Sequence, residues 1–209
     1  MIKLVLTSKS KYKTVAKRAE GFYKEKGSKF IAYAQKCYSE DEVKALLEEW
    51  KKEHHQARHL CYAYRLGLDK AQYRANDDGE PSNSAGAPIL GQIKSFDLTN
   101  VLIGVIRYYG GTKLGVGGLM TAYKTAAKDA LENANIVELE VYDWYNVEFG
   151  YSDMPEMMNK LKSLQLELHE KEFTESCSVL LSLPIHKSAK IIEELKSLET
   201  VEIESKGIY

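Results

Sequence analysis

The sequence has few of the features that mark secreted, membrane-spanning or disulfide-stabilised proteins. It contains three cysteines in 209 residues, and none of them forms a CxxC pair. No apolar run approaches the roughly 18 residues of a membrane span, and the apolar start at residues 1–6 is too short for a signal peptide. The odd number of cysteines, two of them in apolar strand-like runs, predicts buried reduced thiols. We therefore expect a cytoplasmic protein with no membrane segment.

The common catalytic and cofactor motifs are missing as well. The glycine-rich segment lacks the Gly-Lys pair of a P-loop, and Met120 stands where a dinucleotide-binding motif needs its third glycine. The chain has no HExxH zinc motif, no GxSxG elbow and no EF-hand spacing. His54, His55 and His59 flank a predicted helix end, so we interpret them as a surface pair and a histidine at a strand start. These absences exclude nucleotide hydrolysis by a P-loop and Rossmann-type binding, and we expect no cofactor and no metal.

Charge is unevenly distributed along the chain. Residues 1–136 contain 22 Lys and Arg against 15 Asp and Glu, which gives +7, whereas residues 137–209 contain 7 against 15, which gives −8. The asymmetry predicts two domains divided after residue 136, the first better suited to a polyanionic partner. The alternative is two ordinary domains whose surface charges differ without functional consequence.

Hydrophobic periodicity predicts an α+β fold in both parts. In the second part the order is β-α-β-β-α-β, which is the ferredoxin-like arrangement. In the first part the order is β-β-α-β-α-β-α, with a helix that starts at the Ser39–Glu42 capping box and a polar turn at 67–76. The elements expected there are a hairpin of 12–24 and 29–37, a helix after Ser39, a strand at 60–66, a helix at 85–95, a buried strand at 101–107 and a helix that ends near Ala134.

The strongest local pattern is a strand, a glycine-rich turn and a helix. Its candidate binding residues are Arg107, Tyr108, Gly110, Gly111, Thr112, Lys113, Gly115, Gly117 and Gly118. The first turn of a helix presents unpaired N–H groups and partial positive charge, so with Lys113 nearby this segment is suited to an anion such as phosphate. The alternative is a tight connection whose glycines serve backbone geometry alone.

A second irregular segment, 77–82, contains Asp77, Asp78 and Glu80. Three carboxylates in one loop suit a hard cation or acid–base chemistry. Asp-Gly and Glu-Pro are also common turn dipeptides, and we favour a polar turn. Arg58, Arg107 and Lys113 alternate with tyrosines as in some nucleic-acid-binding sheets, although part of these tyrosines would belong to a core.

Several blocks of the sequence together resemble the YigZ/IMPACT family over about residues 10–134. They are Ala57–Arg65, Asp77–Ser82, Ala85–Leu90 and Val105–Tyr123. The resemblance implies a first domain similar to the second domain of a small-subunit ribosomal protein, followed by a ferredoxin-like domain, as in the last two domains of elongation factor G. This chain departs from the family's usual Gly-Thr and Lys at Asn83-Ser84 and Ala87, which removes one positive charge.

Three functional hypotheses follow from the residues and the resemblance. The first is a noncatalytic, translation-regulatory protein that binds RNA or the ribosome, or a protein partner in the translation machinery, with Arg58 and His59 beside the glycine-rich segment. The second is an enzyme that acts on a small phosphorylated or peptide substrate between Asp77–Ser82 and Gly110–Gly118. The third is that both loops only lock unusual turns. We rank binding first, the structural interpretation second and the enzyme third, and likeness of fold alone does not establish any of them.

Overall fold

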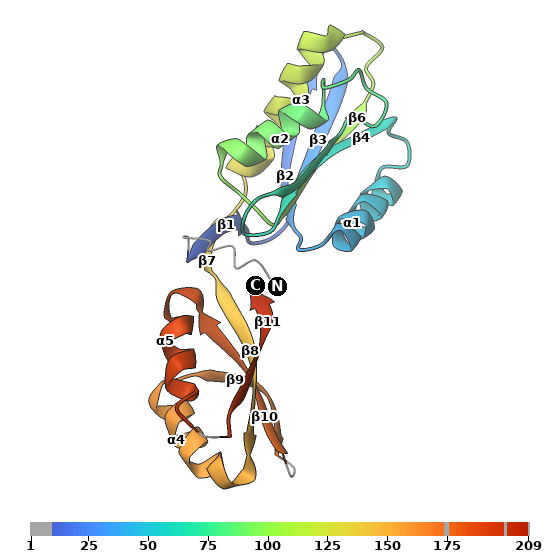
Figure 1. Cartoon of the computed structure of the whole chain (residues 1–209). Helices are drawn as coiled ribbons and strands as arrows, with labels where there is room; N and C mark the ends of the chain where they lie inside the picture. Colours follow the sequence, from blue (N-terminus) through green and yellow to red (C-terminus); the bar gives the residue numbers. More distant parts are fainter. Residues whose placement is uncertain (1–9, 174–175, 199, 209) are drawn as a thin grey trace. The chain divides into compact units, whose positions relative to one another are not determined.

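The computed structural model describes residues 10–173, 176–198 and 200–208 and is α+β, as predicted (Figure 1). The described residues divide into two units, an N-terminal unit of residues 12–139 and a C-terminal unit of residues 140–208 together with Ser10 and Lys11. The boundary expected after residue 136 falls inside β7 (Ile136–Glu140), a strand that the sequence analysis did not predict. No helix in the described ranges is long and apolar enough to cross a bilayer.

Five strands of the described N-terminal unit form one sheet in the order β2-β3-β6-β4-β5. All neighbours in this sheet are antiparallel. Their bounds are β2 (Ala19–Glu25), β3 (Ser28–Lys36), β4 (His59–Leu66), β5 (Gln72–Asn76) and β6 (Val101–Tyr108). The central strand β6 is buried over its whole length except for a half-buried Tyr108, which confirms the central strand predicted from the apolar run.

Helices cover both faces of this sheet (Figure 1). One face packs against α2 (Gly86–Ser95) and α3 (Gly115–Glu132), and the other packs against α1 (Glu40–Glu53). The alanine-rich face of α3 is buried against the sheet, as its three- and four-residue spacing predicted. The predicted cap of α1 is confirmed, because the Ser39 side chain accepts a hydrogen bond from the Glu42 N–H at 3.2 Å.

Two expectations for the N-terminal unit were wrong. Residues 12–24 do not form one strand, since β1 (Lys11–Val15) pairs with β7 and only β2 pairs with β3. The polar stretch 67–76 contains the edge strand β5, whose side chains are almost all exposed. An exposed edge strand has no apolar alternation, so its sequence resembles a turn.

The C-terminal unit has the predicted ferredoxin-like order. Its elements are β8 (Tyr142–Gly150), a short 3-10 turn (Tyr151–Asp153), α4 (Met154–Ser163), β9 (Glu167–Phe173), β10 (Ser176–Pro184), α5 (Ile185–Leu195) and β11 (Glu202–Ile208). The sheet order among the described strands is β11-β8-β10-β9. Both helices lie on one face of this sheet, and its other face is uncovered by them (Figure 1).

The three cysteines are buried and free, as predicted from their odd number and from the apolar runs around two of them. Burial raises the pKa of the Cys37 thiol to about 12, and burial also raises the pKa of Cys61. Because thiolates are the reactive form, these two side chains behave as small apolar core residues in the folded protein.

Candidate nucleic-acid interface

Most of the candidate residues lie at one end of the five-stranded sheet. Here β6 ends at Tyr108, which pairs with Lys29 near the start of β3. On the other side of β6, Arg107 pairs with His59, the first residue of β4. The antiparallel register therefore brings Arg58, His59 and the glycine-rich segment after Tyr108 to the same end of the sheet.

The side chain of Asp77 organises the loop before α2. Its Oδ1 accepts hydrogen bonds from the N–H groups of Ala85 at 2.9 Å and Gly86 at 2.8 Å. Its Oδ2 accepts a third from the N–H of Asn83 at 2.8 Å. A carboxylate that satisfies the unpaired N–H groups at a helix start stabilises that helix. These contacts favour the structural interpretation of Asp77.

Asp78 joins the same loop to the start of β4. Its Oδ2 accepts the Leu60 N–H at 2.7 Å, and its carbonyl oxygen lies 2.7 Å from Nδ1 of His59. Because a carbonyl can only accept, Nδ1 of His59 is the donor in this contact, and Nε2 is the ring nitrogen that can contact a ligand. Asp78 and Gly79 both adopt left-handed φ angles, 42° and 86°, so the loop is a defined turn.

Glu80, Arg107 and Tyr123 form a buried polar cluster beneath this end of the sheet. Nη1 of Arg107 lies 2.5 Å from Oε1 of Glu80, and the Tyr123 hydroxyl donates to the same oxygen at 2.8 Å. The side chains of Arg107 and Glu80 are 7% and 5% exposed. Burial strongly raises the pKa of Tyr123, with further contributions from Cys61 and Glu80.

This cluster contains two of the candidate residues that the sequence pointed to. The sequence pattern places Arg107 among the candidate nucleic-acid-binding residues, and it places Glu80 in the segment 77–82, which we call the acidic loop. The structure buries both side chains and pairs them with each other, 27 residues apart. Arg107 still lies 5.4 Å from the ring centroid of Tyr109, which is 44% exposed. Arg107 therefore contributes to the protein surface only indirectly, by packing beside the exposed ring of Tyr109.

The glycines after Tyr108 have separate structural reasons. A Cβ on Gly110 would lie 1.9 Å from the carbonyl carbon of Gly27, so the two loops touch through their backbones. The N–H of Gly110 also donates to Oγ of Ser28 at 3.1 Å. Gly111 and Gly115 adopt positive φ angles of 86° and 71°, which glycine accommodates without strain.

Gly117 has neither a close backbone contact nor a positive φ angle that would require glycine. A Cβ there would meet no atom within 4 Å, and its φ angle is not positive. It lies in the exposed first turn of α3, whose start at Leu114 has no side-chain cap. The N–H groups of this turn are therefore open to a ligand.

The contact between Gly27 and Gly110 creates a basic surface from two loops. Lys24, Lys26 and Lys29 on the β2–β3 hairpin and Lys113 in the glycine-rich segment are all exposed, and we call this set the basic rim. In the described part of the chain none of these four side chains has an ion-pair partner. The hairpin turn that presents Lys26 has two left-handed residues, Lys26 and Gly27, with φ angles of 45° and 80°.

A pocket of about 310 Å³ lies on the α1 side of the same region. Its polar lining includes Lys51, His54, His55, Arg58, His59 and Asp78. Both ring nitrogens of His54 are already engaged, with the hydroxyls of Tyr33 at 2.7 Å and Tyr108 at 2.9 Å. Within the described ranges no three His, Cys, Asp or Glu side chains converge as a metal site. The excess of cationic groups makes this pocket suited to an anion.

Sequence reasoning missed the hairpin lysines and Lys51. The hairpin itself was predicted, but no local pattern shows that its tip contacts a loop more than 80 residues later. The one indication in the sequence is that both Gly27 and Gly110 are glycines and so allow their backbones to touch. This indication can be recognised only once the order of the strands is known.

Comparison with known proteins agrees with this architecture. The Impact N-terminal domain family matches residues 26–131. This chain belongs to the IMPACT family. It is similar to IMPACT family member YvyE of Bacillus subtilis, with 34% identity over 149 residues that cover 71% of this chain and 69% of the relative. An IMPACT family member of Thermus thermophilus is 38% identical over 159 residues, which cover 75% of this chain and 84% of the relative.

A solved structure titled as a hypothetical protein also matches, with a TM-score of 0.75 and 25% identity over 95% of this chain and 98% of that one. The region matched by the IMPACT-family domain contains the hairpin tip, the acidic loop, the pocket and the glycine-rich segment. Lys26, Lys29 and Lys113 of the basic rim therefore lie within the matched region, and Lys24 precedes it.

Proposed function

We propose that this IMPACT-family protein is a noncatalytic RNA- or ribosome-binding protein, and that the basic rim and the first turn of α3 contact the phosphate backbone. The observation that supports this most directly is the backbone contact between Gly27 and Gly110, which brings unpaired lysines from two distant loops beside an uncapped helix start. The ribosomal-protein and elongation-factor likeness of the sequence favours structured RNA as the partner.

The chemistry of the surface suits a backbone-directed contact. Lysines act on phosphates as point charges, and helix N-termini present N–H donors to them. The exposed ring of Tyr109 lies beside this surface and can stack on an unpaired base. The nearby Glu80 carboxylate is neutralised by Arg107 within the domain, so its repulsion of phosphate is reduced.

The bonds of the acidic loop favour binding over the enzyme hypothesis. The acidic loop and the glycine-rich segment are neighbours, because Glu80 accepts hydrogen bonds from Arg107, just before the glycine-rich segment, and from Tyr123 in α3. However, Asp77 and Asp78 accept backbone N–H groups and Glu80 is ion-paired, so each carboxylate serves to hold the loop. We assign the acidic loop a structural role on these contacts.

The first prediction concerns the salt dependence of RNA binding. The variant Lys26→Gln/Lys29→Gln/Lys113→Gln is expected to bind ribosomal RNA more weakly. The steepness of log affinity against log salt is expected to fall by about 2–3, because binding releases about one counterion fewer from the RNA for each lysine that is removed. Filter binding to ribosomal subunits and to total RNA across a salt series measures this.

A charge-matched variant provides the control. Lys17→Gln/Lys36→Gln/Lys94→Gln removes the same charge from the same unit but away from the basic rim, since Lys36 ends β3 and Lys94 lies near the end of α2. It is expected to change affinity far less. Equal losses in both triple variants would show diffuse attraction and contradict the proposed surface.

The second prediction separates stability from binding at Gly117. Gly117→Ala is expected to raise stability by about 0.5–1 kcal/mol through helix propensity, yet to weaken RNA binding because a methyl group then covers the open first turn. Gly91→Ala is the matched control, since Gly91 is in α2 and its Cβ would also meet no atom within 4 Å. Unchanged RNA affinity in Gly117→Ala would exclude the first turn of α3 from the contact.

A further inference from the structure

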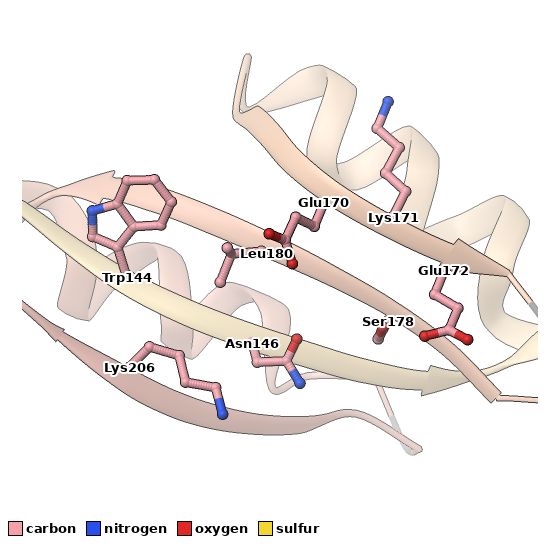
Figure 2. A pocket seen from close by; sticks show the side chains of 8 residues that line it. All are labelled: Trp144, Asn146, Glu170, Lys171, Glu172, Ser178, Leu180 and Lys206. Carbon is pink, nitrogen blue, oxygen red and sulfur yellow. The ribbon is translucent and has the colours of Figure 1, made fainter.

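The uncovered face of the C-terminal sheet is a second surface with a different chemistry. A hollow of about 690 Å³ lies on it, within the C-terminal unit. Figure 2 shows Trp144 at one end of the hollow, Leu180 near its middle, and Glu170, Glu172, Asn146 and Lys206 around them. Because α4 and α5 pack on the opposite face, no described helix of the C-terminal unit lies above these side chains.

The apolar floor of the hollow is built by strand register. Trp144 pairs with Ser182 across β8 and β10, and its ring packs against His169 with centroids 4.4 Å apart. His169 in turn lies 2.6 Å from the Ser182 hydroxyl. A register shift opposite Leu180 and Leu181 leaves His169 without a paired residue, so both His169 and Glu170 contribute to this face.

Glutamates occupy both edges of the face. Two neighbouring rows cross the sheet, and each runs from a glutamate on β9 to a glutamate on β11. The rows are Glu172, Ser178, Glu148 and Glu202, and then Glu170, Leu180, Asn146 and Glu204. Two lysines also line the hollow: Lys206, which is paired with Glu204 at 2.5 Å, and Lys171 on β9.

This arrangement costs stability in the isolated unit. Glu148 lies directly opposite Glu202 on the adjacent strand, and like charges in that relation repel. Residues 140–209, which make up most of this unit, contain 7 Lys and Arg against 14 Asp and Glu, a net charge of −7. A cationic partner would remove the repulsion, whereas RNA would increase it.

We propose that this face docks an extended Lys- or Arg-rich protein segment. Its cationic groups would lie between the two glutamate edges and over the Trp144 ring, and its aliphatic stems would cover Leu180. The complementary charge selects this occupant, because the acidic edges disfavour a nucleic acid and attract a basic chain. The proposal concerns the C-terminal unit alone and is independent of RNA binding by the basic rim.

The test uses the full-length protein and a short peptide of alternating arginine and threonine. The chain has two tryptophans, so two indole N–H resonances are expected in an NMR spectrum, and Trp144→Phe assigns them. The peptide is expected to shift the Trp144 resonance and to leave that of the fully buried Trp50 in place. A peptide with glutamine in place of arginine is expected to shift neither.

Charge-matched variants locate the contact. Glu170→Gln/Glu172→Gln is expected to weaken the peptide roughly fivefold to tenfold, since each exposed pair contributes modestly. Glu156→Gln/Glu193→Gln, at exposed positions on α4 and α5, is expected to change affinity less than about twofold. The proposal would be overturned if the peptide left the Trp144 resonance unmoved, or if both double variants lost the same peptide affinity. It would also be overturned if RNA shifted the Trp144 resonance, or if that resonance shifted with protein concentration in the absence of peptide.

Discussion

Replacing Glu80 by alanine is expected to destabilise the N-terminal unit by about 3–5 kcal/mol, because Arg107 would remain buried without its charge partner. The Tyr123 hydroxyl would lose its acceptor at the same time. Urea unfolding monitored by Trp50 fluorescence in a Trp144→Phe background measures this unit, since Trp50 packs against β6 at Gly104. The expected result is a lower midpoint with an unchanged slope.

Two further variants define the reason for the loss. Glu132→Ala breaks the exposed Lys128–Glu132 pair on α3 and is expected to cost less than about 1 kcal/mol. Glu80→Leu combined with Arg107→Met is expected to recover most of the loss, since an apolar pair leaves no buried charge. A cost below about 1 kcal/mol for Glu80→Ala would show that Arg107 finds another partner or reaches water.

Replacing Gly110 by alanine is expected to cost about 3 kcal/mol or more, since overpacking against backbone cannot be relieved by rotating a side chain. The new Cβ would lie 1.9 Å from the carbonyl carbon of Gly27 and 2.1 Å from the nitrogen of Ser28. The two loops must separate, which also breaks the hydrogen bond from Gly110 to Ser28. Thermal and urea unfolding measure the stability of the variant.

The same substitution is expected to weaken RNA binding if the folded state survives, because the hairpin lysines would move away from Lys113. Gly117→Ala is the control for stability, since it adds the same methyl group in the same segment without a clash. A Gly110→Ala variant as stable as the original protein would show that Gly27 and Gly110 do not touch in solution.

The two proposed surfaces divide the chemistry of the chain between its units. The basic rim is a set of unpaired lysines beside helix N–H groups, which suits phosphate. The face around Trp144 and Leu180 is apolar and edged by glutamates, which suits a basic protein segment. Ribosomal particles offer both kinds of partner, and either surface can be tested without the other.

Part of the candidate site was predictable and part was not. The glycine-rich segment, the loop at 77–82 and the positions of Arg58 and His59 stood out because unusual composition at one place in a sequence is visible locally. The burial of Arg107 was not predictable, because it depends on Glu80 in a loop 27 residues earlier. The lysines at 24, 26 and 29 resembled an ordinary solvated turn until Gly27 was placed against Gly110.

The sequence by itself determined the local elements. The Ser39–Glu42 cap, the hairpin turn at 26–27, the strand–glycine–helix segment and the order of the C-terminal unit depend on residues within a few positions of each other, so periodicity and capping predicted them. Tertiary structure alone decided the pairing of β1 with β7, the edge strand β5, the Glu80–Arg107 pair and the glutamate rows on β8 to β11. These depend on which strands become neighbours and in which register, and no local preference encodes that choice.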